Sequence, residues 1–341
     1  FGEDVPAVVY DNLVKAVHKG LPTLHRYISL RREILNVQKQ HMYDLYLPLV
    51  ENADIKLPYE EAYKTVIEGL APLGKDYQAL LQRAFDERWI DVCENTGKRS
   101  GAYSTGAYDT HPYVLLNYQP TTNEIFTIAH EMGHSIHTYK SNMAQPYNKA
   151  NYTIFLAEIA STVNEVLLLK YLYSHTEDVK LKKFLLNYYI DMFRTTLFRQ
   201  TQFAEFEQIA HAKAEKGESL NKENLSKEYF KLNKKYYGKG IEHDSEIAFE
   251  WARIPHFYRS FYVYKYATGI TSAVSIAKRI LSEGEPAVQD YFKFLSGGNE
   301  TRPVEILKRA GVDLTTTAPF EAAMSEFEAT VAEFERLNQQ V

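Results

Sequence analysis

Cysteine is almost absent from this chain, because Cys93 is the single one among 341 residues. One cysteine cannot form an internal disulfide, which excludes a disulfide-stabilised secreted scaffold and favours a reducing compartment such as the cytoplasm. Nothing in the sequence links Cys93 to a histidine that could activate it. We therefore expect it to be a small buried residue and not a nucleophile.

Long apolar runs and an excess of basic residues are also missing. No run approaches the roughly 20 residues that span a bilayer, and we expect no signal peptide. The net charge is −5 and no basic stripe is present, which argues against nucleic acid as a partner. A hydrophobic fraction of 45% with 24% charged residues is typical of a globular chain. The start at Phe1 indicates a fragment or a processed chain.

One short segment, His130-Glu131-Met132-Gly133-His134, has the spacing of a metal site that carries its own base. On a helix, His130 and His134 lie one turn apart on the same face, where two imidazoles can bind one Zn²⁺. Glu131 lies roughly 100° further round the helix, within reach of a zinc-bound water. Thr121 and Glu124 form a capping box that begins a helix upstream. These features favour a zinc peptidase motif over a solvated helix face.

A catalytic zinc ion usually has three protein ligands, and a later helix offers the third. One class of such enzymes carries its last histidine where this chain has Lys140, which excludes that class. Glu158 follows His134 at a separation that allows a helix end, a turn and an antiparallel helix over residues 152–173. Because Glu158 stands in an apolar run, we predict it as the third ligand, with a salt bridge to a helix neighbour as the alternative.

Two more residues lie on the faces that carry these ligands. Glu165 shares the face of Glu158, so we expect it to accept the second ring N–H of His130 or His134 and to fix the tautomer. His137 shares the face of the two histidines and could compete as a ligand. We favour a role for His137 in packing, or in a hydrogen bond that supports one of the metal ligands.

Residues 97–119 have the composition of a β-hairpin in a chain otherwise patterned as helix. A strand edge beside the zinc could pair with an extended peptide, and glycine would allow its backbone to approach closely. On this basis we predict Gly101, Ala102 and Tyr103 as substrate-binding residues. The alternative is a hairpin that only covers the core.

Helical patterns occupy the remaining chain. Residues 6–37 predict two helices broken near Gly20-Leu21-Pro22, and Pro58 predicts the first turn of another helix. A long helical stretch follows near residues 178–216. No repeat or low-complexity linker appears.

The expected fold class is therefore mainly α. We predict a single catalytic domain over residues 1–341, with one small β-sheet or hairpin (97–119) beside the active-site cleft and a zinc-binding helix pair (120–175) within it.

Three blocks in order, HEMGHSIH, AEIASTVNE and IPHFYRSFYVYKYATG, resemble the oligoendopeptidase F branch of the thimet-oligopeptidase family. The upstream segment KRSGAYSTGAYDTHPYVLLNY is similar to a hairpin of that branch. The resemblance implies an almost wholly helical fold, cytoplasmic location, and one zinc ion held by His130, His134 and Glu158, with Glu131 as general base. It also implies oligopeptide substrates and a further helical region before this part. That region is expected to be cut off or supplied as a separate chain.

The third block contains candidate donors for the oxyanion that forms when water attacks a peptide carbonyl. The interval between His256 and Tyr266 resembles that of a His and Tyr pair in related helical zinc peptidases, so we predict these two as catalytic residues. Tyr262 and Tyr264 flank the pair and are predicted to contact substrate. The thimet-type branch spaces its tyrosines differently, so roles among the three remain open, and an aromatic core stripe is the alternative.

Together these features predict a zinc metalloendopeptidase that hydrolyses internal bonds of oligopeptides through Glu131-assisted attack of zinc-bound water. A zinc carboxypeptidase of similar helical fold is one alternative, because Arg253, Arg259 or Lys265 could hold a terminal carboxylate. A metal-binding module without activity, or a fragment inactive without its N-terminal region, is the other.

Overall fold

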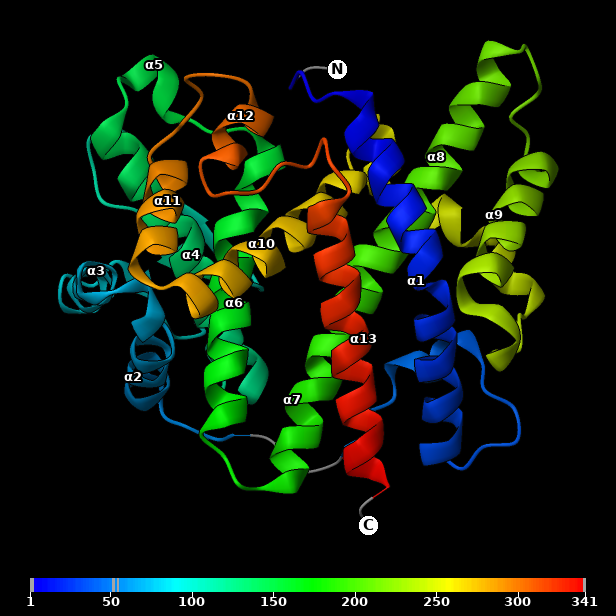
Figure 1. Cartoon of the computed structure of the whole chain (residues 1–341), viewed down its shortest axis with the longest axis horizontal. Coiled ribbons are helices and arrows are strands. Elements are labelled where there is room, and N and C mark those ends of the chain that lie inside the picture. The colour runs from blue at the N-terminus through cyan, green and yellow to red at the C-terminus, as the bar shows by residue number, and fades with distance from the viewer. Residues whose placement is uncertain (1–2, 51–52, 54, 340–341) are drawn as a thin grey trace. The chain divides into compact units, whose positions relative to one another are not determined.

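The structure, a computed structural model, describes residues 3–50, 53 and 55–339 (Figure 1). This described part is mainly α-helical with one small sheet, as predicted. It divides into two compact units: Phe1–Pro6, Ala53–Leu181 and Gly269–Pro319 form the first, and Ala7–Asn52, Lys182–Thr268 and Phe320–Val341 form the second. No sequence pattern predicts this division, because several boundaries fall inside helices and not in linkers.

The first unit contains the predicted hairpin and the predicted zinc-binding helices. Pro58 lies directly before its first helix, where the fixed φ of proline favours the start of a helix. The elements of the unit are α2 (Tyr59–Gly69), the 3-10 turn η2 (Ala71–Leu73), α3 (Lys75–Asp86), β1 (Ile90–Asp91), β2 (Tyr103–Thr105), β3 (Tyr113–Leu115), α4 (Thr122–Ala144), α5 (Tyr147–Ala150), α6 (Ile154–Ser174), most of α10 (Tyr264–Glu283), α11 (Glu285–Leu295) and α12 (Pro303–Lys308).

The small sheet has the order β1-β3-β2. β2 and β3 form the predicted antiparallel hairpin, with Ser104 opposite Val114. The sequence did not predict β1, which pairs in parallel with β3 and places Ile90 beside Val114. Two residues are too few to carry a strand pattern, so only the long-range pairing defines β1.

The helices α4 and α6 are the centre of the first unit and pack along each other (Figure 1). α4 begins at the predicted cap, where the side chain of Thr121 accepts the backbone N–H of Glu124 at 3.4 Å. The backbone N–H of Thr121 donates to the carbonyl of Gln119 and not to Glu124, so only half of the predicted capping box forms. The fully buried amide of Asn164 on α6 donates to the carbonyl of Ala129 on α4 at 2.9 Å and accepts from Tyr77 on α3 at 2.9 Å. A buried amide with both ends satisfied fixes three helices in one arrangement.

The second unit is built on a different set of helices. Its elements are α1 (Ala7–Ile34), η1 (Met42–Tyr46), most of α7 (Val179–Met192), the π-helical segment η3 (Phe193–Phe198), α8 (Arg199–Glu215), α9 (Lys222–Tyr237), the 3-10 segments η4 (Gly238–Gly240), η5 (Ser245–Arg253) and η6 (Pro255–Tyr258), and most of α13 (Ala318–Asn338).

The predicted break near Gly20-Leu21-Pro22 is wrong, because α1 runs through it with Pro22 inside the helix. The glycine marks a close approach instead: a Cβ at Gly20 would lie 2.4 Å from the sulfur of Met324 and 3.3 Å from the ring of Phe198. A proline removes one helical hydrogen bond, and the apolar face that α1 buries outweighs that loss.

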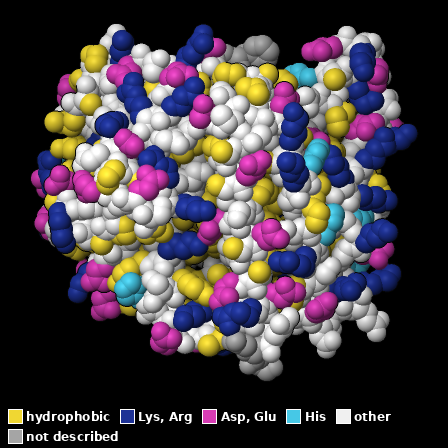
Figure 2. Space-filling model, viewed as in Figure 1, with side chains coloured by type: hydrophobic (Ala, Val, Ile, Leu, Met, Phe, Trp, Pro, Cys, Tyr) yellow, Lys and Arg dark blue, Asp and Glu magenta, His cyan; other side chains and the backbone are white. Residues whose placement is uncertain are grey.

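Two features of the surface bear on the expectations from composition. Cys93 is exposed in the loop after β1, so the prediction of a buried residue is wrong. On the face drawn in Figure 2, acidic and basic side chains occur together over most of the surface. None of the described helices combines the length and the apolar character that crossing a bilayer requires.

Candidate metal centre

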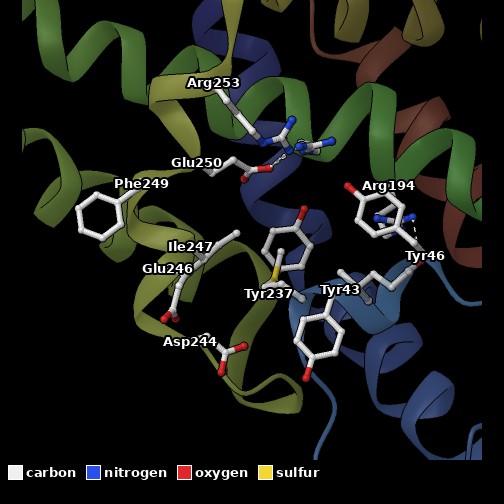
Figure 3. A pocket seen from close by; sticks show the side chains of 13 residues that line it. Tyr43, Tyr46, Arg194, Tyr237, Asp244, Glu246, Ile247, Phe249, Glu250 and Arg253 are labelled. Atoms are coloured by element: carbon white, nitrogen blue, oxygen red, sulfur yellow. Dashed lines mark hydrogen bonds and ion pairs between the residues drawn. The ribbon is translucent and has the colours of Figure 1, made fainter.

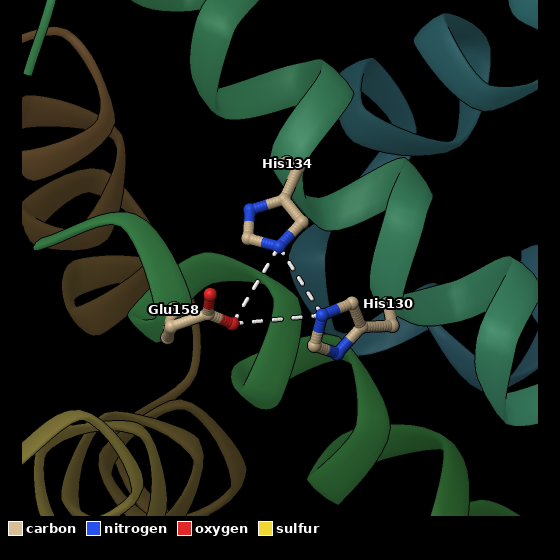
Figure 4. A group of neighbouring side chains, drawn as sticks. All are labelled: His130, His134 and Glu158. Carbon is tan, nitrogen blue, oxygen red and sulfur yellow. Dashed lines mark hydrogen bonds and ion pairs between the residues drawn. The ribbon is translucent and has the colours of Figure 1, made fainter. Parts of the chain in front are cut away.

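Three predicted ligands from two helices of the first unit point at one another (Figure 4). The Nε2 atoms of His130 and His134 lie 3.2 Å apart. The Oε2 atom of Glu158 lies 3.6 Å from each of these nitrogens. In the described part of the chain these three residues are the one group of histidine, cysteine or carboxylate side chains arranged to share an ion.

The spacing of these atoms suits a single zinc ion. Zinc binds imidazole nitrogen and carboxylate oxygen at about 2.1 Å, so two ligands in tetrahedral geometry are separated by about 3.4 Å. The three observed separations of 3.2, 3.6 and 3.6 Å lie close to that value. Two neutral imidazoles and one carboxylate also form the donor set of open catalytic zinc sites. The residues present therefore fit the ion.

The second ring nitrogen of each histidine is also bound. Nδ1 of His130 lies 2.6 Å from Oε1 of Glu165, which confirms the expected contact of that glutamate with one of the two histidines. The ring of His134 hydrogen-bonds to the backbone of Ala157 instead. Contacts of this kind hold the ring orientation and leave Nε2 of each imidazole for the metal.

The protonation of the two histidines differs in the metal-free site. Burial disfavours a charged His130, but the adjacent Glu165 carboxylate outweighs burial and raises the pKa of His130 to about 9. Burial and the charge of His130 lower the pKa of His134 to about 3. One proton thus occupies the histidine pair near neutral pH, and a metal ion must displace it.

Glu131 has the features expected of a base. Its side chain is only 7% exposed, and Oε2 has no hydrogen-bond partner in the described part of the chain. Burial raises the pKa of its carboxyl, His130 opposes the shift, and the nearby carboxylates of Glu158 and Glu165 add to it. The backbone of Ser104 on β2 hydrogen-bonds to the same carboxyl. A buried carboxyl oxygen without a partner is costly unless a ligand or a proton uses it.

Gly133 within the motif allows the two helices to approach. A Cβ at this position would lie 2.6 Å from Cα of Ser161 and 2.7 Å from the carbonyl oxygen of Ala160. These are backbone atoms, so they cannot move aside as a flexible side chain would. We did not predict this role for Gly133 from the sequence, because it depends on the distance between α4 and α6.

His137 is fully buried, and it is not part of the group of described residues that could share an ion. Its ring stacks on Tyr152 with centroids 3.6 Å apart, and neither nitrogen has a hydrogen-bond partner in the described chain. Burial lowers the pKa of His137 to about 3, so it is a neutral packing residue. This placement agrees with the packing role favoured from the sequence.

The hairpin lies against α4, because Oγ of Ser104 and Oγ of Ser135 are 2.8 Å apart. Gly101 is exposed with a φ of 89°, and its carbonyl accepts from the side chain of Asn117 at 2.9 Å. Tyr103 is 45% exposed at the start of β2, the strand at one edge of the sheet. Ala102 between them is half-buried.

The other predicted residues belong to the second unit and gather around one ring. The His256 ring lies 5.7 Å from the Tyr262 ring and 5.9 Å from the Tyr266 ring. The hydroxyls of Tyr266 and Tyr262 are 3.3 Å apart. Tyr264 points elsewhere: it is buried and packs edge-on against Tyr10, as a core residue does.

Sequence reasoning missed the backbone groups at the centre, at Ser104 and Ala157. Main-chain donors and acceptors leave no trace in residue identity, so no pattern could have found them. Gly133 stands within the motif in the sequence, but its role in the contact between α4 and α6 depends on how closely α6 packs.

The sequence model of Peptidase family M3 matches residues 2–326 of this chain. The chain belongs to this family. The M3 chain is 51% identical over 333 residues to oligopeptidase PepF of Bacillus subtilis, covering 98% of this chain and 50% of the relative. It is 47% identical to an oligoendopeptidase F homolog of Lactococcus lactis, covering 98% and 55% respectively. The predicted resemblance to oligoendopeptidase F is thereby confirmed.

Solved structures agree with the M3 assignment. A putative peptidase from Chlamydophila abortus matches with a TM-score of 0.92 at 42% identity, over 99% of this chain and 56% of the other. Oligoendopeptidase-F from Enterococcus faecium matches with a TM-score of 0.78 at 41% identity, over 99% and 54%. This chain spans about half the length of the curated relatives it matches.

Proposed function

We propose that this chain carries the catalytic centre of a zinc-dependent oligoendopeptidase. The observation behind the proposal is the arrangement of His130, His134 and Glu158 around one point, with the unpartnered Oε2 of Glu131 on the same helix, α4, and its carboxyl close enough to interact with His130 and Glu158. When bound, zinc acts as a Lewis acid that polarises a peptide carbonyl and makes water more acidic. Membership of Peptidase family M3 supports the same reaction class.

Different residues of the chain have different roles in the proposed reaction. Glu131 takes the proton of the attacking water and passes it to the leaving amine, and its raised pKa suits a group that must both accept and release a proton. Glu165 holds the ring of His130 in the orientation that presents Nε2. The edge strand β2 is proposed to align an extended peptide, with Gly101, Ala102 and Tyr103 at its start.

His256 and Tyr266 are proposed as donors to the oxyanion. Their rings and that of Tyr262 already form one cluster of an imidazole and two phenols. Tyr262 is the better candidate of its flanking pair for a substrate contact, because Tyr264 is buried against Tyr10. The names of the relatives support short peptides as substrates. The free, exposed cysteine suits a reducing compartment such as the cytoplasm, where we propose that the chain acts.

The direct test is Glu131→Gln, measured both as zinc content and as cleavage of internally quenched peptides blocked at both ends. We expect stoichiometric zinc with a loss of turnover of about 10²- to 10⁴-fold. Glu124→Gln, in the first turn of the same helix, is the matched control and should keep both. Full activity of Glu131→Gln would exclude the mechanism. Glu158→Ala should lose zinc, and retained stoichiometric zinc would mean that another residue is the ligand.

Blocked peptides also separate the endopeptidase from the carboxypeptidase alternative. Arg253 donates to Glu250 at 2.6 Å, and Arg259 and Lys265 both lie over the ring of Tyr262. Cleavage of doubly blocked peptides supports an endopeptidase, whereas strict dependence on a free carboxyl terminus supports the alternative. Zinc content reports on the centre even if turnover needs the rest of a longer protein.

A further inference from the structure

A pocket of about 370 Å³ opens in the second unit, apart from the residues assigned to catalysis (Figure 3). Segments distant in sequence form it: η1 supplies Tyr43 and Tyr46, the π-helical segment and the start of α8 supply Arg194 and Arg199, and α9 ends in it with Tyr237. The segment η5 closes one side. The volume is in the range of sites for small molecules.

The floor of this pocket contains a hydroxyl without a partner. Tyr237 is 2% exposed, and its hydroxyl makes no hydrogen bond to any described residue, although it lines the pocket. Figure 3 shows its ring between Tyr43 and the side chains of Glu250 and Arg253. Burial raises the pKa of Tyr237 to about 12, against the effect of Arg194 and Arg199, so the hydroxyl keeps its proton and can donate. A hydroxyl that opens into a pocket and has no protein partner there can donate to a ligand or to water.

Two guanidinium groups face the same space and keep unused donors. Arg194 uses Nε for Asp191 at 2.7 Å and Nη2 for the carbonyl of Leu45 at 3.3 Å, which leaves Nη1. Arg199 gives Nη2 to Glu250 and stacks over the ring of Phe203, which leaves Nε and Nη1. Arg194 lies in a π-helical turn, a distortion that is frequent at functional sites.

The charges of the pocket lining are separated: Figure 3 shows Arg194 and Arg253 at one end and Asp244 and Glu246 at the other. Glu250 is shared by Arg199, Arg253 and the hydroxyl of Tyr229. Asp191 is shared by Arg194 and by the fully buried Arg31. Arg31 and Asp191 lie behind the lining, which itself carries three guanidinium groups and three carboxylates, and among these described acids of the lining Glu250 is the one that contacts its cations. The remaining acids, Asp244 bound to His41 and the exposed Glu246, lie at the start of η5, away from Arg194.

The mouth of the pocket is aromatic and exposed. Tyr43 is 65% exposed, Tyr46 is 64% exposed and Phe249 is 44% exposed, and all three line it. Met42, Leu45 and Ile247 add aliphatic wall. Exposed apolar side chains gathered around a cationic floor suit a ligand with one negative end and an apolar body.

We propose that this pocket binds a small carboxylic acid with an aromatic or bulky aliphatic body, the carboxylate accepting from Tyr237, Arg194 and Arg199. The same chemistry is offered by a free acid and by the C-terminal residue of a short peptide. The site is independent of zinc, and the proposal does not rest on the function proposed for the metal centre.

Isothermal titration calorimetry with N-acetyl-L-phenylalanine tests the site. We expect saturable binding with a dissociation constant on the order of 1 mM or tighter. N-acetyl-L-phenylalaninamide, which has the same body without the charge, should bind at least about tenfold more weakly. Acetyl-Ala-Phe with a free carboxylate distinguishes the sources: equal or tighter binding indicates a peptide terminus, and loss of binding indicates a free acid.

Tyr237→Phe is the decisive variant, because removing an unpartnered hydroxyl costs the fold no hydrogen bond. It should weaken binding of the acid about tenfold and leave the weak binding of the amide unchanged. Tyr147→Phe, the same change at a 74% exposed position of the first unit, should not alter either value. No saturable binding of the acid, equal binding of acid and amide, or an unchanged affinity in Tyr237→Phe would each overturn the proposal.

Discussion

Gly133 on α4 and Ser161 on α6 are in backbone contact at the centre of the first unit: a Cβ on Gly133 would lie 2.6 Å from Cα of Ser161. This contact sets the separation of the helix that carries His130 and His134 from the helix that carries Glu158. Three ligand atoms must stay within a few tenths of an ångström of their positions to hold one ion. The glycine of the motif therefore controls the metal site without touching the metal.

Gly133→Ala should force the two helices apart. We expect a loss of unfolding free energy of about 1–3 kcal/mol, typical of an overpacked interface, together with weaker zinc binding. Thermal unfolding with and without zinc, and competition with a chelator, measure the two effects. Thr127→Ala in the same helix is the control, because it adds no atom to the interface. Unchanged zinc affinity in Gly133→Ala would show that the helix separation does not govern the site.

Glu165→Gln should lower zinc affinity by about 10- to 100-fold, because the amide carries no charge to favour the tautomer that presents Nε2 of His130. Chelator competition at pH 7.5 measures it. The exposed Glu177 offers the control substitution Glu177→Gln. An affinity within twofold of the original would mean that Glu165 does not orient the ligand.

Zinc binding should release on the order of one proton per ion near neutral pH. In the metal-free site the pKa of His130 is raised to about 9, so this ring is protonated below that pH, while His134 with its lowered pKa is already neutral. Apparent affinity should thus fall about tenfold for each unit that pH drops below 9, and level off above it. Calorimetry in buffers of different ionisation enthalpy counts the protons. A count near zero at pH 7 would contradict the assignment.

Glu207→Gln should change the pH dependence of stability. Glu207 on α8 is 4% exposed and accepts the backbone N–H of Phe261 at 2.5 Å, and burial raises its pKa to about 7. Between about pH 4.3, where the unfolded carboxyl titrates, and pH 7, the folded chain keeps a proton that the unfolded chain has lost. Stability therefore falls as pH rises through this window and stays lower above it.

Replacement by glutamine removes that decline, so Glu207→Gln should gain on the order of 3 kcal/mol relative to the original chain between pH 4 and pH 8. Denaturant unfolding at both pH values measures the difference. Glu215→Gln on the exposed end of the same helix is the control and should follow the original chain. Parallel stability curves for Glu207→Gln and the original chain would exclude a titrating Glu207.

Local chemistry made part of this molecule predictable. The cap at Thr121, the helix faces that carry His130 and His134, and the shared face of Glu158 and Glu165 all follow from helical periodicity and hydrogen-bonding capacity. Three features could not be predicted in this way: the strand β1, the unbroken helix α1 and the exposure of Cys93. Each of them depends on whether a segment distant in the chain packs against it.

The sequence alone determined which side chains of the centre could bind a metal, since ligand type and residue spacing on a helix are local properties. Only the tertiary structure decided that Gly133 lets Glu158 reach the two histidines and that the backbone of Ser104 meets Glu131. It alone also brought Tyr237, Arg194 and Arg199 around one pocket. These are contacts between segments far apart in the chain, and close packing, which no local pattern encodes, selects them.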